Sequence, residues 1–186
     1  MSLQLLRRAF TVEDYHRMVQ AGILREDDRV ELLEGEILEM APIGSRHAAC
    51  VDRLNQLFSD RVRKRAIVRV QNPIGMGERS EPQPDLTLVR PRPDFYSQSH
   101  PGPGDILLVV EVAETSVEVD RDLKVPLYAR AGIPEVWLVD LSAECIEVFR
   151  TSSPQGYHDV RRVRRGDRLA PGALPDLDLA VHDLLG

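Results

Sequence analysis

The stretch "DILLVVEVAETS", residues 105–116, decides the fold. Every position from Ile106 to Val110 is aliphatic, so an extended segment here is apolar on both of its faces. Such a run is typical of a central strand that is covered by other layers on both sides. Glu111 then stands between two valines. Because burying an unpaired carboxylate is costly, Glu111 needs a cation, a basic partner or an exposed strand end.

The segments that follow this strand predict a parallel neighbour. A helical segment ends at residues 131–132, and "PEVWLVD" at 134–140 is again strand-like. The order strand, helix, strand implies a right-handed crossover between two parallel strands. Residues 144–152 and 157–165 then predict a hairpin around 154–156.

The segments before the central strand complete a mixed sheet with helices. A helix capped by Thr11 is expected over 11–22, and a longer one over 45–65, where apolar residues recur at helical spacing. Residues 29–40 predict a hairpin around Glu34-Gly35, and 66–71 and 85–89 predict further strands. We therefore expect an α/β fold, a mixed central β-sheet flanked by helices, in a single domain over residues 1–186.

Composition and charge limit the function classes. The chain has 186 residues, enough for one domain with a real core, and a formal net charge of −6. That charge gives no whole-molecule attraction for phosphate backbones, so nucleic-acid binding needs a local basic patch. The apolar runs are too short to span a membrane and the N-terminus lacks a secretory signal, which predicts a cytoplasmic protein. Cys50 and Cys145 form no CxxC pair, so we expect neither a disulfide framework nor a zinc site.

Three ionisable residues fall at the ends of these expected elements: Asp85, Glu111 and Lys124. Two carboxylates on neighbouring strands can hold a hard divalent cation, and a lysine beside it could activate water or stabilise charge on a phosphate. Each residue also has a plain interpretation. Asp85 could be a turn residue after Pro84, and Lys124 could form a surface ion pair with Asp120, four residues earlier. Pro126 should interrupt the helix that carries Lys124.

Several ordered segments resemble a known family. "EPQPDLTLV" (81–89), "LLVVEVAETSVEVDRDLK" (107–124) and "LYARAGIPEVWLVD" (127–140) together look like the Uma-type endonuclease family. This family lies within the restriction-endonuclease-like, or PD-(D/E)xK, nuclease superfamily. "VELLEGEILEM" (30–40), His47 and "LPDLDLAVHDLL" (174–185) resemble it as well, so the resemblance spans nearly the whole chain.

The resemblance implies a restriction-endonuclease-like fold with a divalent metal at one end of the sheet. Asp85 and Glu111 match the acidic metal ligands of the family pattern. The superfamily lysine stands two residues after the second acid, where this chain has Ala113, and Lys124 on the next helix is its implied replacement.

Two further positions also match the family. Glu31 and His47 are the additional site candidates that the resemblance implies. Glu31 could instead be an exposed hairpin residue, and His47 a satisfied core histidine. Glu114 and Asp120 could face the same cleft, but acids near a helix start often serve as caps.

Basic runs at 61–65 and 161–165 could contact phosphates, although a solvated face explains either run alone. Trp137 is expected in the core rather than as a platform for stacked bases.

The first hypothesis is a Mg²⁺- or Mn²⁺-dependent nuclease, an endonuclease acting on DNA, assembled as a homodimer so that symmetric sites can cut both strands. The rival is a non-catalytic module that keeps the fold for nucleic-acid or protein binding. A metal-dependent hydrolase of small phosphate esters is a third alternative. Fold alone does not decide among them.

Overall fold

The structure is a computed structural model that describes residues 8–25 and 27–186. The expected absence of a secretory signal concerns residues 1–10, of which 1–7 lie outside the described residues. The helices are α1 (Val12–Gln20), α2 (Ser45–Val62), α3 (Val117–Val119), α4 (Val125–Arg130) and α5 (Val181–Leu185), with a 3₁₀ turn η1 (Pro103–Asp105) and a π-helical turn η2 (Asp120–Lys124). The strands are β1 (Val30–Leu33), β2 (Glu36–Glu39), β3 (Ile67–Val70), β4 (Leu86–Val89), β5 (Ile106–Ala113), β6 (Glu135–Asp140), β7 (Cys145–Ser153), β8 (Gly156–Arg164), β9 (Arg168–Leu169) and β10 (Leu179–Ala180).

A six-stranded mixed sheet in the order β3-β4-β5-β6-β7-β8 forms the centre of the fold. Only β5 and β6 pair in parallel, and the segment α3-η2-α4 connects them, as the strand–helix–strand pattern predicts. The predicted hairpins are present as well, with β1 paired to β2 and β7 paired to β8. The α/β class with a mixed sheet is therefore confirmed.

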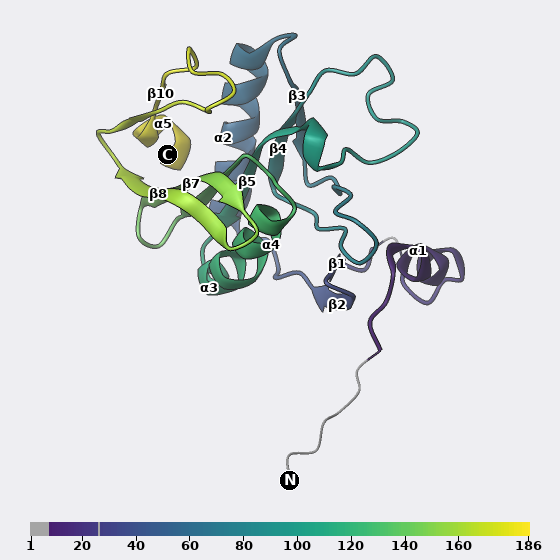
Figure 1. Cartoon of the computed structure of the whole chain (residues 1–186). Helices are drawn as coiled ribbons and strands as arrows, with labels where there is room; N and C mark the ends of the chain where they lie inside the picture. The colour runs from purple at the N-terminus through teal and green to yellow at the C-terminus, as the bar shows by residue number, and fades with distance from the viewer. Residues whose placement is uncertain (1–7, 26) are drawn as a thin grey trace.

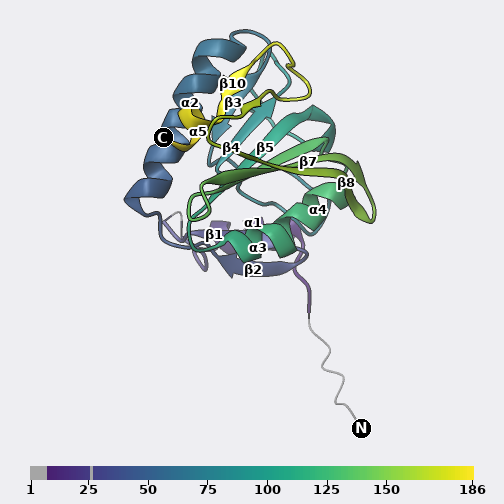
Figure 2. The ribbon, with the colours of Figure 1, turned by 90° about the vertical axis from the view of Figure 1, so that its left-hand side faces the viewer.

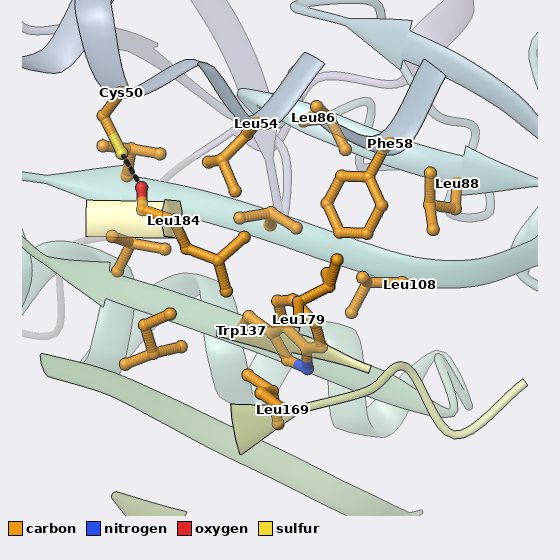
Figure 3. Packing of buried hydrophobic residues seen from close by; sticks show 14 of the residues in the cluster. Cys50, Leu54, Phe58, Leu86, Leu88, Leu108, Trp137, Leu169, Leu179 and Leu184 are labelled. Atoms are coloured by element: carbon orange, nitrogen blue, oxygen red, sulfur yellow. Dashed lines mark hydrogen bonds between the residues drawn. The ribbon is translucent and has the colours of Figure 1, made fainter. Parts of the chain in front are cut away.

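Each face of the sheet carries its own apolar cluster. The first cluster packs α2 and α5 against one face, where Phe58 and Trp137 lie with ring centroids 5.9 Å apart (Figure 3). Trp137 is fully buried and belongs to the core, as expected. The second cluster places α4 on the other face, close to the β1–β2 hairpin, as Figures 1 and 2 show. Because β5 is buried on both sides, its unbroken aliphatic run is explained.

Local signals account for the element ends. Thr11 and Asp14 form a reciprocal capping box at the start of α1, which satisfies main-chain donors there. Gly35 has φ +85° in the β1–β2 turn, and a Cβ at this position would collide with the Cβ of Ala9, so only glycine fits. The expected helix over 45–65 is too long. It ends at Val62, because Arg63 leaves the helical region with φ +52°.

The connection between β5 and β6 contains a break in helical geometry. The main-chain N–H of Val125 bonds to the carbonyl of Asp120, five residues back, so η2 is one residue wider than an α-helical turn. Pro126 follows in the first turn of α4, where its missing N–H causes no loss. The interruption expected at Pro126 lies before it: the π-helical turn ends at Lys124, and regular α-helical geometry begins at Val125 and includes Pro126.

The described part of the chain holds no helix that combines the length and the apolar character needed to cross a membrane.

Candidate active site

Asp85 lies immediately before β4, where the start of that strand meets the end of β5. Its Oδ2 accepts hydrogen bonds from the main-chain N–H of Val112 at 2.9 Å and from Nε2 of His47 at 3.0 Å. The amide of Gln71 donates to Oδ1 at 3.3 Å. These donors come from β5, α2 and the end of β3, so the carboxylate is held in one orientation.

Glu111 is 2 % exposed, late in β5. The hydroxyl of Tyr128, on α4, donates to its Oε1 at 2.5 Å, and Nζ of Lys124 lies 3.5 Å from the same oxygen. Within the described residues, no hydrogen bond reaches the second oxygen, Oε2, while the residue lines a cavity. One carboxylate oxygen is therefore anchored, and the other is available to a ligand.

Lys124 projects from η2 into a group of carboxylates and is almost completely buried. Its Nζ lies 3.0 Å from Oε1 of Glu31 and 3.7 Å from Oδ1 of Asp120. The other oxygen of Glu31 accepts from the main-chain N–H of Gln83 at 3.0 Å. The pairing of Asp120 with Lys124 thus exists, but it is buried within the site instead of lying on the surface.

The electrostatics follow from burial and from this crowding of acids. Burial raises the pKa of Glu111 to about 8, Lys124 opposes that rise, and the neighbouring acids reinforce it. Burial alone would lower the pKa of Lys124, but Glu111, Glu31 and Asp120 together raise it above its usual value. Lys124 is therefore a permanent ammonium, whereas Glu111 can bind or release a proton near neutral pH.

The contact between His47 and Asp85 favours the protonated form of the imidazole. The hydrogen bond to Asp85 raises the pKa of His47, partly offset by burial. Its Nδ1 is buried and has no hydrogen-bond partner within the described residues. The protonated ring would add a second positive charge beside the acids.

These side chains border one cavity of about 350 Å³. Its floor is acidic, and its rim is formed by Arg29, by the segment between β2 and α2, and by the start of α3. The lining residues are Arg29, Glu31, Glu39, Met40, Ala41, Pro42, Ile43, Gly44, His47, Gln83, Asp85, Glu111, Val112, Glu114, Thr115, Ser116, Val119, Asp120 and Lys124. A concave site with buried, shifted titratable groups is the usual location of catalysis.

A sequence model of one family covers almost the whole chain. The Uma2 family, described as "Putative restriction endonuclease", matches residues 12–182. The chain belongs to the Uma2 family. Comparison with curated protein sequences gives no match.

Among solved structures, the Uma2 chain is similar to a DUF820 "putative nuclease" from Anabaena variabilis. The TM-score is 0.72 at 16% sequence identity, and the match covers 95% of this chain and 97% of that one. This likeness shows that the Uma2 chain has the restriction-endonuclease-like fold. A second match is to the type IIG restriction endonuclease BpuSI, with a TM-score of 0.40 at 21% identity, and it covers 63% of this chain and 14% of that one. This similarity is too low to support a conclusion about the fold or the function.

The donor set of the Uma2 site suits a hard divalent cation bound by few protein ligands. Within residues 8–25 and 27–186, no three His, Cys, Asp or Glu side chains are arranged as a metal cage. Mg²⁺ commonly takes only one or two carboxylates and fills its shell with water and substrate phosphates, so a cage is not required. Burial, reinforced by neighbouring acids, raises the pKa of Glu111 and Asp120, and a bound cation would stabilise their charged forms. The residues therefore fit such an ion.

All five residues singled out from the sequence border this cavity: Glu31, His47, Asp85, Glu111 and Lys124. Of the two acids set aside, Asp120 joins the group around Lys124, while Glu114 lines the cavity and binds Arg46 at 2.8 Å. Sequence reasoning missed Tyr128, although it stands four residues after Lys124 and so shares its helical stripe.

Gln71 was also missed, because no sequence signal distinguishes a strand-end glutamine that turns back on Asp85.

In this Uma2 protein the two basic runs, 61–65 and 161–165, lie outside the candidate active site. In the first, Arg65 pairs with Asp176, beyond the end of α2. In the second, on and just after β8, Arg162 pairs with the buried Glu147 and Arg165 with Glu144. Neither run lines the acidic cavity.

Proposed function

We propose that this protein is a nuclease that depends on Mg²⁺ or Mn²⁺ and hydrolyses phosphodiester bonds in DNA, as an endonuclease. The proposal is carried by the convergence of Asp85 and Glu111 on one cavity, with the buried ammonium of Lys124 beside them. Membership in the family described as "Putative restriction endonuclease" supports the same reaction class.

Asp85 and Glu111 would hold the metal ion. When bound, the ion would polarise the phosphate and lower the pKa of a coordinated water. Asp85 would offer Oδ1, which accepts one long hydrogen bond from Gln71, whereas Oδ2 already accepts two shorter ones. Glu111 would offer Oε2, because Tyr128 and Lys124 engage Oε1.

Lys124 would act as a hydrogen-bond donor and a fixed positive charge. Its raised pKa means that it stays protonated, so it would orient water and stabilise negative charge on the phosphate instead of removing a proton. Glu31 and Asp120 hold the ammonium in place from two further sides. His47 would orient Asp85.

The test is cleavage by the purified protein of supercoiled plasmid, single-stranded DNA and RNA in Mg²⁺ or Mn²⁺. Asp85→Ala and Glu111→Gln should abolish cutting and metal binding measured by calorimetry. Glu118→Gln, an exposed acid on α3, is the matched control and should cut like the wild type. If no substrate is cut and neither substitution changes metal binding, the nuclease proposal is wrong. DNA bound tightly but uncut in both metals would favour the non-catalytic alternative.

Homodimeric assembly, cytoplasmic location and a single domain over residues 1–186 stay predictions. Light scattering coupled to gel filtration would test assembly. A dimer would let two symmetric sites act on two strands.

A further inference from the structure

A second cavity, of about 210 Å³, is bordered by three arginines. Arg46 and Arg53 extend from α2, and Arg165 follows β8. The other lining residues are Ala49, Leu141, Glu144, Leu185 and Gly186. The lining thus contains three guanidinium groups and one carboxylate, in a chain whose net charge is −6. We call this the arginine cavity.

Two of the three arginines are held by partners. Arg46 donates from Nη1 to Glu114 at 2.8 Å and from Nη2 to the carbonyl of Leu141 at 3.1 Å. Arg165 donates from Nη2 to the carbonyl of Gly186 at 2.6 Å and to Glu144 at 3.3 Å. These contacts fix the walls of the arginine cavity.

Arg53 is different, because its Nη1 is buried and has no hydrogen-bond partner among the described residues. A buried donor without an acceptor destabilises the fold, and more so when it is charged. Cys50 lies one turn earlier on α2, but its thiol donates to the main-chain carbonyl of Leu184 in α5 and makes no hydrogen bond with Arg53. The guanidinium of Arg53, which borders the arginine cavity, therefore has one donor without an acceptor.

The arginine cavity shares a wall with the candidate active site. Consecutive residues at the start of α2, Arg46 and His47, border the arginine cavity and the acidic cavity respectively. The ion pair between Arg46 and Glu114 spans the boundary, because Glu114 lines the acidic cavity. An anion bound beside Arg53 would therefore lie next to the site of cleavage along α2.

We propose that the arginine cavity binds a backbone phosphate of the substrate nucleic acid, flanking the phosphate that is cut. This inference rests on the proposed function. Guanidinium groups match phosphate oxygens with paired donors, and phosphate contacts position a nucleic acid without reading its sequence. The cavity would hold the strand in register, so that the flanking phosphodiester enters the acidic cavity.

The experiment measures binding of a fluorescein-labelled DNA oligonucleotide by anisotropy across a salt series, in EDTA so that no cleavage occurs. Arg53→Gln should weaken binding about tenfold and lower the slope of log K against log salt by about one. Arg53→Lys keeps the charge but loses the planar fork, so it should bind more weakly than the wild type with the slope retained. Arg61→Gln is the matched control, because Arg61 lies on the same helix outside the cavity. It should keep the wild-type slope.

The outcomes separate this inference from the proposed function. A wild-type protein that binds and cuts DNA, beside an Arg53→Gln protein indistinguishable from Arg61→Gln, overturns the arginine cavity alone. A wild-type protein that neither binds nor cuts nucleic acid removes both proposals. In a parallel thermal-unfolding assay with inorganic phosphate, stabilisation of the wild type but not of Arg53→Gln, without any difference in DNA binding, would assign the cavity to free phosphate and overturn the nucleic-acid site.

Discussion

The ammonium of Lys124 lies 3.0 Å from the carboxylate of Glu31, which joins the turn after β5 to the β1–β2 hairpin at the other end of the chain. Both side chains are buried, so the contact is screened little by solvent. A cation in this position compensates several acids at once. The stability of the site therefore depends on Lys124.

Replacing Lys124 by methionine should destabilise the metal-free protein by roughly 3–5 kcal/mol at pH 7, because breaking a buried ion pair leaves uncompensated charge. Urea unfolding measures the change. Lys64→Met removes an exposed lysine and should leave stability nearly unchanged. Equal stability of both variants would show that the buried carboxylates do not need the ammonium.

Tyr128→Phe removes the hydroxyl that anchors Oε1 of Glu111. Removing the hydroxyl donor from this buried oxygen should cost about 1–3 kcal/mol of unfolding free energy and lower kcat, since the carboxyl group is then less restrained. Tyr96→Phe is the matched control, because it removes another hydroxyl hydrogen bond, to the carbonyl of Arg90, from a buried tyrosine outside the site. Stability should fall in both variants, and cleavage only in Tyr128→Phe. A wild-type kcat for Tyr128→Phe would exclude an orienting role.

His47→Ala should weaken metal binding about 10- to 100-fold, because it removes a donor that orients Asp85. Calorimetric titration with Mn²⁺ measures the affinity. His100→Ala alters an exposed histidine and serves as the control. Unchanged Mn²⁺ affinity in His47→Ala would mean that Val112 and Gln71 suffice to hold Asp85.

The contribution of Glu111 to the stability of the metal-free protein should fall as pH rises from about 4.5 to about 8. The pKa of Glu111 is raised from its ordinary value of 4.5 to about 8, so within this range the folded state holds a proton that the unfolded state has lost. Stability therefore falls with pH, by at most about 1.4 kcal/mol per pH unit from this group.

Denaturant unfolding at several pH values measures this slope. Glu111→Gln, which cannot ionise, should flatten it. If the slopes of Glu111→Gln and the wild type coincide, Glu111 does not carry the raised pKa.

Much of the fold follows from short-range patterns. The aliphatic run of β5 predicts a strand buried on both faces, and the strand–helix–strand order predicts its parallel partner β6. Capping by Thr11 is a local hydrogen-bond pattern, so it is also visible in the sequence.

The site is harder to derive, because its contacts join distant segments. The burial of Glu31 depends on the β1–β2 hairpin packing beside η2, which no local pattern encodes. Ala113 shows the same limit. It is fully buried on the side of β5 that faces α4, and the ammonium that contacts Glu111 belongs to Lys124 on another element.

The geometry of the site depends on the one extra residue in the π-helical turn η2. One residue of an α-helix corresponds to a rotation of about 100° about the helix axis. Deleting Asp122 to restore α-helical hydrogen bonding would therefore rotate the segment before it, which includes α3 and Asp120, relative to α4. Lys124 and Tyr128 would stay on the stripe that faces Glu111, whereas Asp120 and its bond to Ser116 would rotate away. The extra residue in the turn thus sets how the segment that carries Asp120 is rotated relative to the helix that carries Tyr128.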